Sequence, residues 1–151
     1  MKILLIYATN SGSTYLAGCI IRDVLAKKYN VVVKKTVEVD PSELEKYGAI
    51  IFGSPSWDFE GKEGQPHQTM LVLMEKLKGT NFSGKPCAVY GCGDTSYTHF
   101  CGAVDELEKF VAAEGGKLVM DSLRIDGYYF DLQKNEEKVG QWAGALVNCL
   151  K

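Results

Sequence analysis

Two patterns of hydrophobic and polar positions alternate along the chain. Short continuous apolar runs, such as residues 2–7, are typical of strands that are buried on both faces of a parallel sheet. Longer segments with apolar residues three or four positions apart predict amphipathic helices. The expected strands are residues 2–7, 31–37, 49–52, 87–90 and 118–125, and the helices expected to follow them are residues 14–29, 40–47, 67–78, 104–114 and 139–150.

This alternation of strands and helices predicts an α/β fold with a parallel sheet, right-handed crossovers and helices on both faces. No repeat or low-complexity segment divides the chain, so residues 1–151 are expected to form a single domain. Ligands of such sheets bind beyond the carboxyl ends of the strands, where the strand order reverses. Polar, glycine-containing loops follow the first, third and fourth strands, and no comparable cluster follows the second or fifth. The ligand site is therefore expected where these three loops meet.

Composition narrows the classes of function. A formal net charge of −2 argues against a broad nucleic-acid-binding surface. No apolar run approaches the roughly 20 residues of a membrane span, and the first strand begins too early to leave room for a signal peptide. The five cysteines include no C-x-x-C pair, so no metal site is expected. Their odd number indicates a reduced, cytoplasmic protein.

The first loop combines hydroxyl groups, an amide and a glycine between a strand and a helix. Its residues are Thr9, Asn10, Ser11, Gly12, Ser13 and Thr14. Backbone N–H groups, hydroxyls and the positive end of the following helix can bind an anion there. The loop contains no Lys or Arg, and it matches neither G-x-x-x-x-G-K-[ST] nor G-x-G-x-x-G. It suits a single phosphate monoester, and the alternative is a capped helix start without a ligand.

The other two loops each contribute an aromatic residue. Trp57 lies within the polar segment 53–66, and Tyr97 lies within the segment 91–100 beside two glycines and Asp94. A large ring on a polar loop is unusual because its exposure to water is unfavourable. Each aromatic alone could be an ordinary surface or core-edge residue. Together, and beside a phosphate loop, they favour a planar ligand held between two rings.

These residues resemble a known family, the short-chain flavodoxins, which are small FMN-binding electron carriers. The family's T/S-x-T/S-G-x-T phosphate motif is met by residues 9–14. The motifs GCGDTSYTHFCGAVDELE at 91–108 and LRIDG at 123–127 match the family closely, and the Trp-bearing loop after the third strand fits as well. The resemblance covers essentially the whole chain. It implies a flavodoxin-like, doubly wound, five-stranded parallel sheet of order 2-1-3-4-5.

The resemblance also implies a role for each matching residue. Residues 9–14 would bind the FMN phosphate, Trp57 would cover the inner face of the flavin ring, and Tyr97 would stack on the outer face. The remaining residues would line the ribityl chain and the edges of the ring, several of them through backbone groups. They are Pro55, Ser56, Asp58, Cys92, Gly93, Asp94, Phe100 and Cys101.

One of these positions departs from the family pattern. Family members often have Gly directly after the loop Trp, where a peptide flips to hydrogen-bond flavin N5 upon reduction, and this chain has Asp58. A turn with positive φ would cost Asp about 1 kcal/mol more than Gly. Either this penalty weakens stabilisation of the one-electron-reduced flavin, or the turn is shifted so that Gly61 serves.

The implied function is low-potential one-electron transfer by non-covalently bound FMN, shuttling between semiquinone and hydroquinone. The protein would be a monomeric electron carrier rather than an enzyme, and its redox partners would dock transiently at the exposed flavin edge. The alternative is a flavin-dependent NAD(P)H or quinone reductase on the same fold, against which the two aromatic walls argue. A phospho-acceptor signalling domain would need Asp where the third strand ends in Gly53-Ser54.

Overall fold

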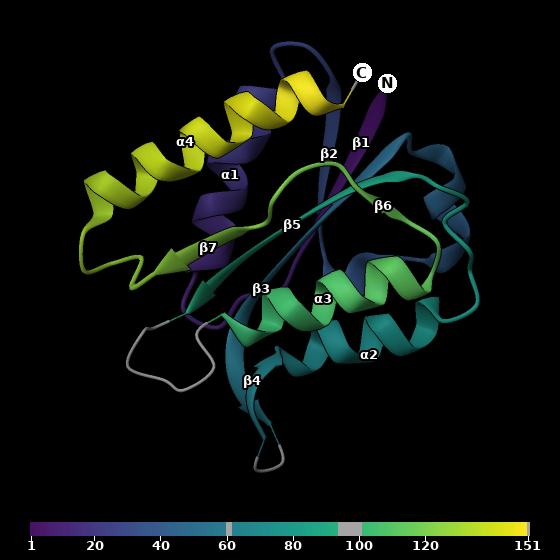
Figure 1. Cartoon of the computed structure of the whole chain (residues 1–151), viewed down its shortest axis with the longest axis horizontal. Coiled ribbons are helices and arrows are strands. Elements are labelled where there is room, and N and C mark those ends of the chain that lie inside the picture. The colour runs from purple at the N-terminus through teal and green to yellow at the C-terminus, as the bar shows by residue number, and fades with distance from the viewer. Residues whose placement is uncertain (60–61, 94–100, 151) are drawn as a thin grey trace.

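The computed structural model describes residues 1–59, 62–93 and 101–150. Its centre is a sheet with helices on both faces (Figure 1). The parallel strands are β1 (Lys2–Tyr7), β2 (Asn30–Lys35), β3 (Ala49–Phe59), β5 (Pro86–Gly93), β6 (Lys117–Leu118) and β7 (Leu123–Asp126). The helices are α1 (Ser13–Leu25), α2 (Gln68–Leu77), α3 (Gly102–Ala113) and α4 (Leu132–Cys149), with two 3₁₀ helices, η1 (Thr36–Glu38) and η2 (Pro41–Lys46).

The sheet order confirms the predicted fold class. The strands lie in the order β2-β1-β3-β5-β6, and β7 also pairs with β5. The expected fifth strand is thus two short strands, of which β6 pairs with the start of β5 and β7 with its end. With β5 counted as the fourth strand, this is the order 2-1-3-4-5.

Alternate residues of the strands enter two separate hydrophobic cores. On β1, Ile3 and Leu5 pack with α1 and α4, whereas Leu4 and Ile6 pack with α2 and α3. All four side chains are fully buried, which explains why the strand has no polar face in the sequence. Figure 1 shows the two helix pairs on opposite sides of the sheet.

The segment 53–66 differs from its prediction as a loop. The strand β3 continues to Phe59 and pairs antiparallel with β4 (Lys62–Pro66). This polar segment lies beyond the main sheet, and its two arms satisfy each other's backbone hydrogen bonds. Because most of its residues are polar or glycine, its sequence shows no hydrophobic alternation from which a strand could be predicted. The pairing register shifts between Trp57 and Phe59, where Asp58 of β3 lies opposite two residues of β4, Glu63 and Gly64.

Candidate functional site

Four loops meet at the carboxyl edge of the sheet. The Ala8 N–H donates to the Gly53 carbonyl at 2.9 Å, which joins the ends of β1 and β3. The Gly127 N–H donates to the Gly93 carbonyl, also at 2.9 Å, which joins the segment after β7 to the end of β5. The loops after the first, third and fourth predicted strands therefore originate at one edge, as expected, and the loop after the last strand joins them.

The first loop leads into a helix that has no side-chain cap. Gly12 occupies the N-cap position of α1 with φ 93°, a conformation that favours glycine. The Gly12 N–H donates to Thr9 Oγ1 at 2.9 Å and is therefore already hydrogen-bonded within the loop. The N-cap residue, a glycine, has no side chain that could cap the helix, and the first turn holds no acidic residue. The helix start therefore lacks the side-chain cap of its N-cap residue that a capped start would have, and the N–H groups of its first turn could bind an anion.

Two hydroxyls of this loop are buried inside the first turn of α1. Thr14 is 0% exposed, and its Oγ1 makes no hydrogen bond with any residue that the structure describes. Burial raises the pKa of the neighbouring Cys92 thiol, and interactions with the hydroxyls of Ser13 and Thr14 lower it in part. A thiol is a weak acceptor, so it does not satisfy a hydroxyl as an oxygen would. A buried hydroxyl without an oxygen or nitrogen partner is costly, so the Thr14 hydroxyl is available to hydrogen-bond a ligand oxygen.

A buried tyrosine supports the same turn from beneath. The Tyr90 hydroxyl donates to the Thr14 carbonyl at 2.9 Å. Its ring fills the space beside two glycines, since a Cβ at Gly53 would lie 2.1 Å from Tyr90 Cζ and one at Gly18 would lie 2.7 Å from the hydroxyl. Complete burial raises the pKa of Tyr90 well above its usual value, so it remains a neutral donor.

The second loop is braced to the helices of the other face. The buried Ser54 Oγ accepts from the His67 N–H at 2.9 Å. Ser56 Oγ accepts from the Ala103 N–H at 3.1 Å. Pro55, between them, pairs in register with Cys92 of β5. Trp57 and Asp58 follow on β3, and their predicted contacts with a ligand lie outside what the structure describes.

The third loop is described at its two ends. Gly93 ends β5 in register with Asp126 of β7. Cys101 is the N-cap of α3 with φ 50°, and its buried Sγ lies 3.8 Å from the carbonyl oxygens of Gly91 and Ile125. Burial raises the pKa of the Cys101 thiol to about 12, so the thiol stays neutral. The predicted site residues between these ends lie outside the described residues; they are Asp94, Tyr97 and Phe100.

The fourth loop received no role from the sequence pattern, yet it contacts the first. The Tyr129 hydroxyl donates to the Ser11 carbonyl at 2.7 Å. The available signal was the run of three aromatic residues, 128–130, in a polar stretch. Such a run indicates that some of these rings contact other parts of the protein. It does not identify Ser11, 118 positions away, as the residue contacted.

Across the described ranges 1–59, 62–93 and 101–150, no group of three or more His, Cys, Asp or Glu side chains could hold a metal ion. None of the helices described there is both long and apolar enough to cross a membrane.

The strand order, with the loops gathered at the carboxyl edge of the sheet, defines the class of protein. It is a doubly wound α/β protein of the flavodoxin-like type. The flavodoxin family model matches residues 5–138. A flavodoxin of Nitratidesulfovibrio vulgaris is 33% identical over 151 residues, covering 99% of each chain. The structure of oxidised flavodoxin 2 from Bacillus cereus superimposes with a TM-score of 0.87 at 32% identity, covering 98% of this chain and 99% of that one.

A further structure, Fusobacterium nucleatum flavodoxin bound to flavin mononucleotide, has the same fold with a TM-score of 0.84 at 20% identity, covering 99% of each chain. This chain belongs to the flavodoxin family, whose members are FMN-binding electron carriers.

Proposed function

We propose that this protein is a low-potential one-electron carrier that binds FMN non-covalently and shuttles between its semiquinone and hydroquinone states. The observation that carries the proposal is the first turn of α1. It has no side-chain cap, and it buries the Thr14 hydroxyl without a partner among the described residues. A phosphate bound there would accept from that hydroxyl and from the first N–H groups of the helix.

The predicted site residues would contact different parts of the FMN molecule. Thr9, Asn10, Ser11, Gly12, Ser13 and Thr14 form the phosphate loop, while Pro55 and Ser56 border the ribityl chain. Trp57 and Tyr97 would cover the two ring faces and exclude water. Backbone groups of five further residues would meet the ring edge, which Phe100 would flank. They are Asp58, on the N5 side, and Cys92, Gly93, Asp94 and Cys101. Flavin supplies the redox chemistry, and the protein sets its potential.

Charge around the phosphate loop favours a low potential. The loop contributes no Lys or Arg, so the phosphate would keep its negative charge apart from the attraction of the helix dipole. A further electron on the flavin adds negative charge in a site of low dielectric constant, and nearby negative charge opposes it. The protein thereby disfavours the second reduction.

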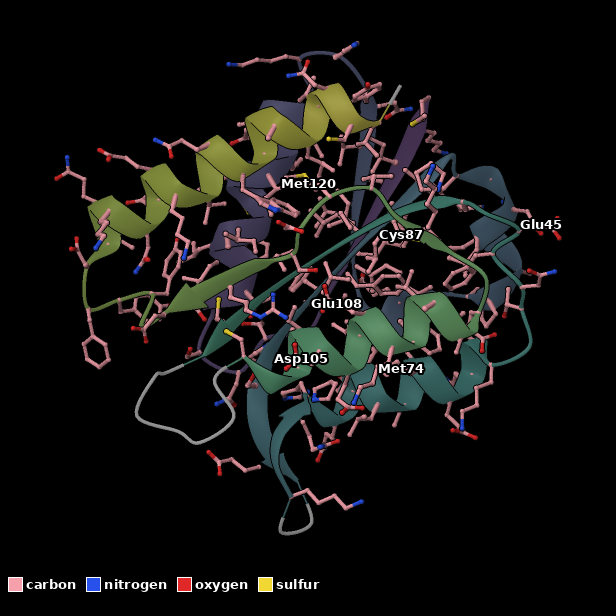
Figure 2. The ribbon with its side chains drawn as sticks, viewed as in Figure 1. Glu45, Met74, Cys87, Asp105, Glu108 and Met120 are labelled. Atoms are coloured by element: carbon pink, nitrogen blue, oxygen red, sulfur yellow. The ribbon has the colours of Figure 1, made fainter. Side chains whose placement is uncertain are left out.

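The acidic side chains near the site do not all contribute equally to the electrostatic attraction of a redox partner. Asp105 and Glu108 lie on α3 (Figure 2), and Arg124 of β7 forms ion pairs with both carboxylates. One guanidinium compensates only part of the charge of two carboxylates, so we assign these side chains a reduced part in attracting a basic partner. We propose a monomeric, single-domain protein whose redox partners dock transiently on a small polar face. Its five free cysteines fit the reducing conditions of the cytoplasm.

The test of this function is an anaerobic reductive titration of the purified protein. It should be yellow, release FMN on denaturation, and take up electrons in two separate steps. Colourless protein that fails to bind added FMN would refute the cofactor assignment. Steady oxidation of NAD(P)H by the isolated protein would instead identify it as a reductase.

Asp58→Gly is expected to increase the accumulation of neutral semiquinone in the same titration. If the Asp58 peptide must adopt positive φ upon reduction, glycine relieves about 1 kcal/mol, which corresponds to about 40 mV for one electron. The irregular pairing of β3 with β4 at this position is the structural reason for choosing it. An unchanged amount of semiquinone would show that another peptide, such as that of Gly61, makes the N5 contact.

A further inference from the structure

The loop between β7 and α4 is a tightly held turn. The buried Asn135 Nδ2 lies 3.2–3.3 Å from three carbonyl oxygens, those of residues 126–128, and shares its two N–H donors among them. The Phe130 N–H donates to the Gly127 carbonyl at 2.8 Å. Asp131 caps α4, accepting from the Lys134 N–H at 3.3 Å. This turn is therefore a firm base for any side chain that it projects toward the site.

Tyr129 projects from this turn to the phosphate loop. Its hydroxyl donates to the Ser11 carbonyl at 2.7 Å. Its ring packs edge-on against Tyr128, with centroids 5.4 Å apart and an interplanar angle of 87°. Tyr128 belongs to the hydrophobic core on the α1 and α4 face and is only 4% exposed. Although Tyr129 itself is 51% exposed, its ring thus has a buried support.

The peptide unit between Ser11 and Gly12 is consequently held at both ends. Tyr129 donates to its carbonyl, and its N–H donates to Thr9 Oγ1 at 2.9 Å. This unit directly precedes Ser13, the first residue of α1. Its orientation determines the direction in which the free N–H groups of the helix start point. The absence of a side chain at Gly12 also matters, because a Cβ there would lie 3.2 Å from the Tyr129 hydroxyl.

We propose that Tyr129 is a positioning residue for the phosphate loop and that it sets the preference of the site for FMN over riboflavin. The proposal rests on the proposed function, since it concerns the same FMN site. With the tyrosine hydroxyl present, the loop is ordered before the phosphate arrives, and binding costs less conformational entropy. Riboflavin shares the ring and the ribityl chain but has no phosphate, so it gains nothing from an ordered loop.

Tyr129→Phe tests this assignment, with Tyr29→Phe as the matched control. Tyr29 also donates its hydroxyl to a backbone carbonyl, that of Val147 at 3.1 Å, but it lies beyond the C-terminal end of α1, whereas the loop lies at the N-terminal end. The flavin-free form of each protein is titrated with FMN and with riboflavin, following flavin fluorescence. We expect Tyr129→Phe to weaken FMN binding about threefold to tenfold, the range of one hydrogen bond, and to change riboflavin affinity less than twofold. Tyr29→Phe should leave the ratio of FMN affinity to riboflavin affinity unchanged.

Amide hydrogen exchange of the flavin-free proteins gives a readout that does not depend on flavin. The Gly12 amide should exchange faster in Tyr129→Phe than in the wild type or in Tyr29→Phe. Equal losses of FMN and riboflavin affinity would make Tyr129 a general structural residue and overturn the proposal. If the wild type binds FMN and Tyr129→Phe binds it equally tightly, the proposal is also overturned. A wild type that binds no FMN would overturn the proposed function, and this assignment with it.

Discussion

Gly53→Ala is expected to destabilise the protein by about 3 kcal/mol, near the upper end of the usual cost of overpacking. An added Cβ would lie 2.1 Å from Cζ and 2.3 Å from Cε1 of the Tyr90 ring, which is fully buried. The ring cannot move freely, because its hydroxyl donates to the Thr14 carbonyl on its far side. Urea denaturation of the flavin-free protein measures the effect.

Gly140→Ala provides the matched control for that measurement. Gly140 lies within α4, and a Cβ there would meet no atom within 4 Å. The same substitution is therefore expected to stabilise the protein by about 0.5–1 kcal/mol through helix propensity. Adding Tyr90→Leu to Gly53→Ala should recover part of the lost stability, since the two sites are in contact. A loss below about 1 kcal/mol in the single variant would contradict the packing account.

Thr14→Val should change stability and ligand affinity in opposite directions. Valine has nearly the shape of threonine but removes the buried hydroxyl that lacks a hydrogen bond among the described residues. The flavin-free protein should gain about 1 kcal/mol, because a buried polar group without a partner is costly. FMN affinity should fall about tenfold to hundredfold, because a hydrogen bond to a charged phosphate is worth about 1.5–3 kcal/mol.

Denaturation of the flavin-free form and fluorescence titration with FMN measure these two effects separately. Thr36→Val is the control, as Thr36 is a second buried threonine, located at the start of η1 rather than in the phosphate loop. It should leave FMN affinity within about twofold, well under the effect of one lost hydrogen bond. A Thr14→Val protein that binds FMN as tightly as the wild type would show that the hydroxyl does not reach the phosphate.

Hydrophobic periodicity was a sound guide to the elements that form the two cores. Residues 2–7 form β1 with the predicted bounds, and the apolar spacing at 67–78 marks the buried face of α2. These segments can be predicted because a strand buries a continuous run of apolar residues and a helix buries one apolar face. Burial therefore determines which positions must be apolar. The first strand of the chain and the loop that follows it could thus be placed without coordinates.

Periodicity was a poor guide where pairing occurs outside the cores. The β3–β4 hairpin, predicted as a loop, gains its order from backbone hydrogen bonds, which leave little trace in side-chain type. The division of the last strand into β6 and β7 is similar, since both remain parallel partners of β5. The short helix predicted at 40–47 is the 3₁₀ helix η2, which Asp40 caps by accepting from the Ser42 N–H at 3.0 Å.

By itself, the sequence determined the class of fold, the family resemblance and the loop that begins at Thr9, because these depend on local patterns and contiguous motifs. Only the tertiary structure decided how that loop is held. Tyr90 supports it from a strand 76 positions away, and Tyr129 reaches it from a turn 118 positions away. Such contacts depend on the course of the whole chain around two cores, and no local pattern of residue types encodes which hydroxyl meets which carbonyl.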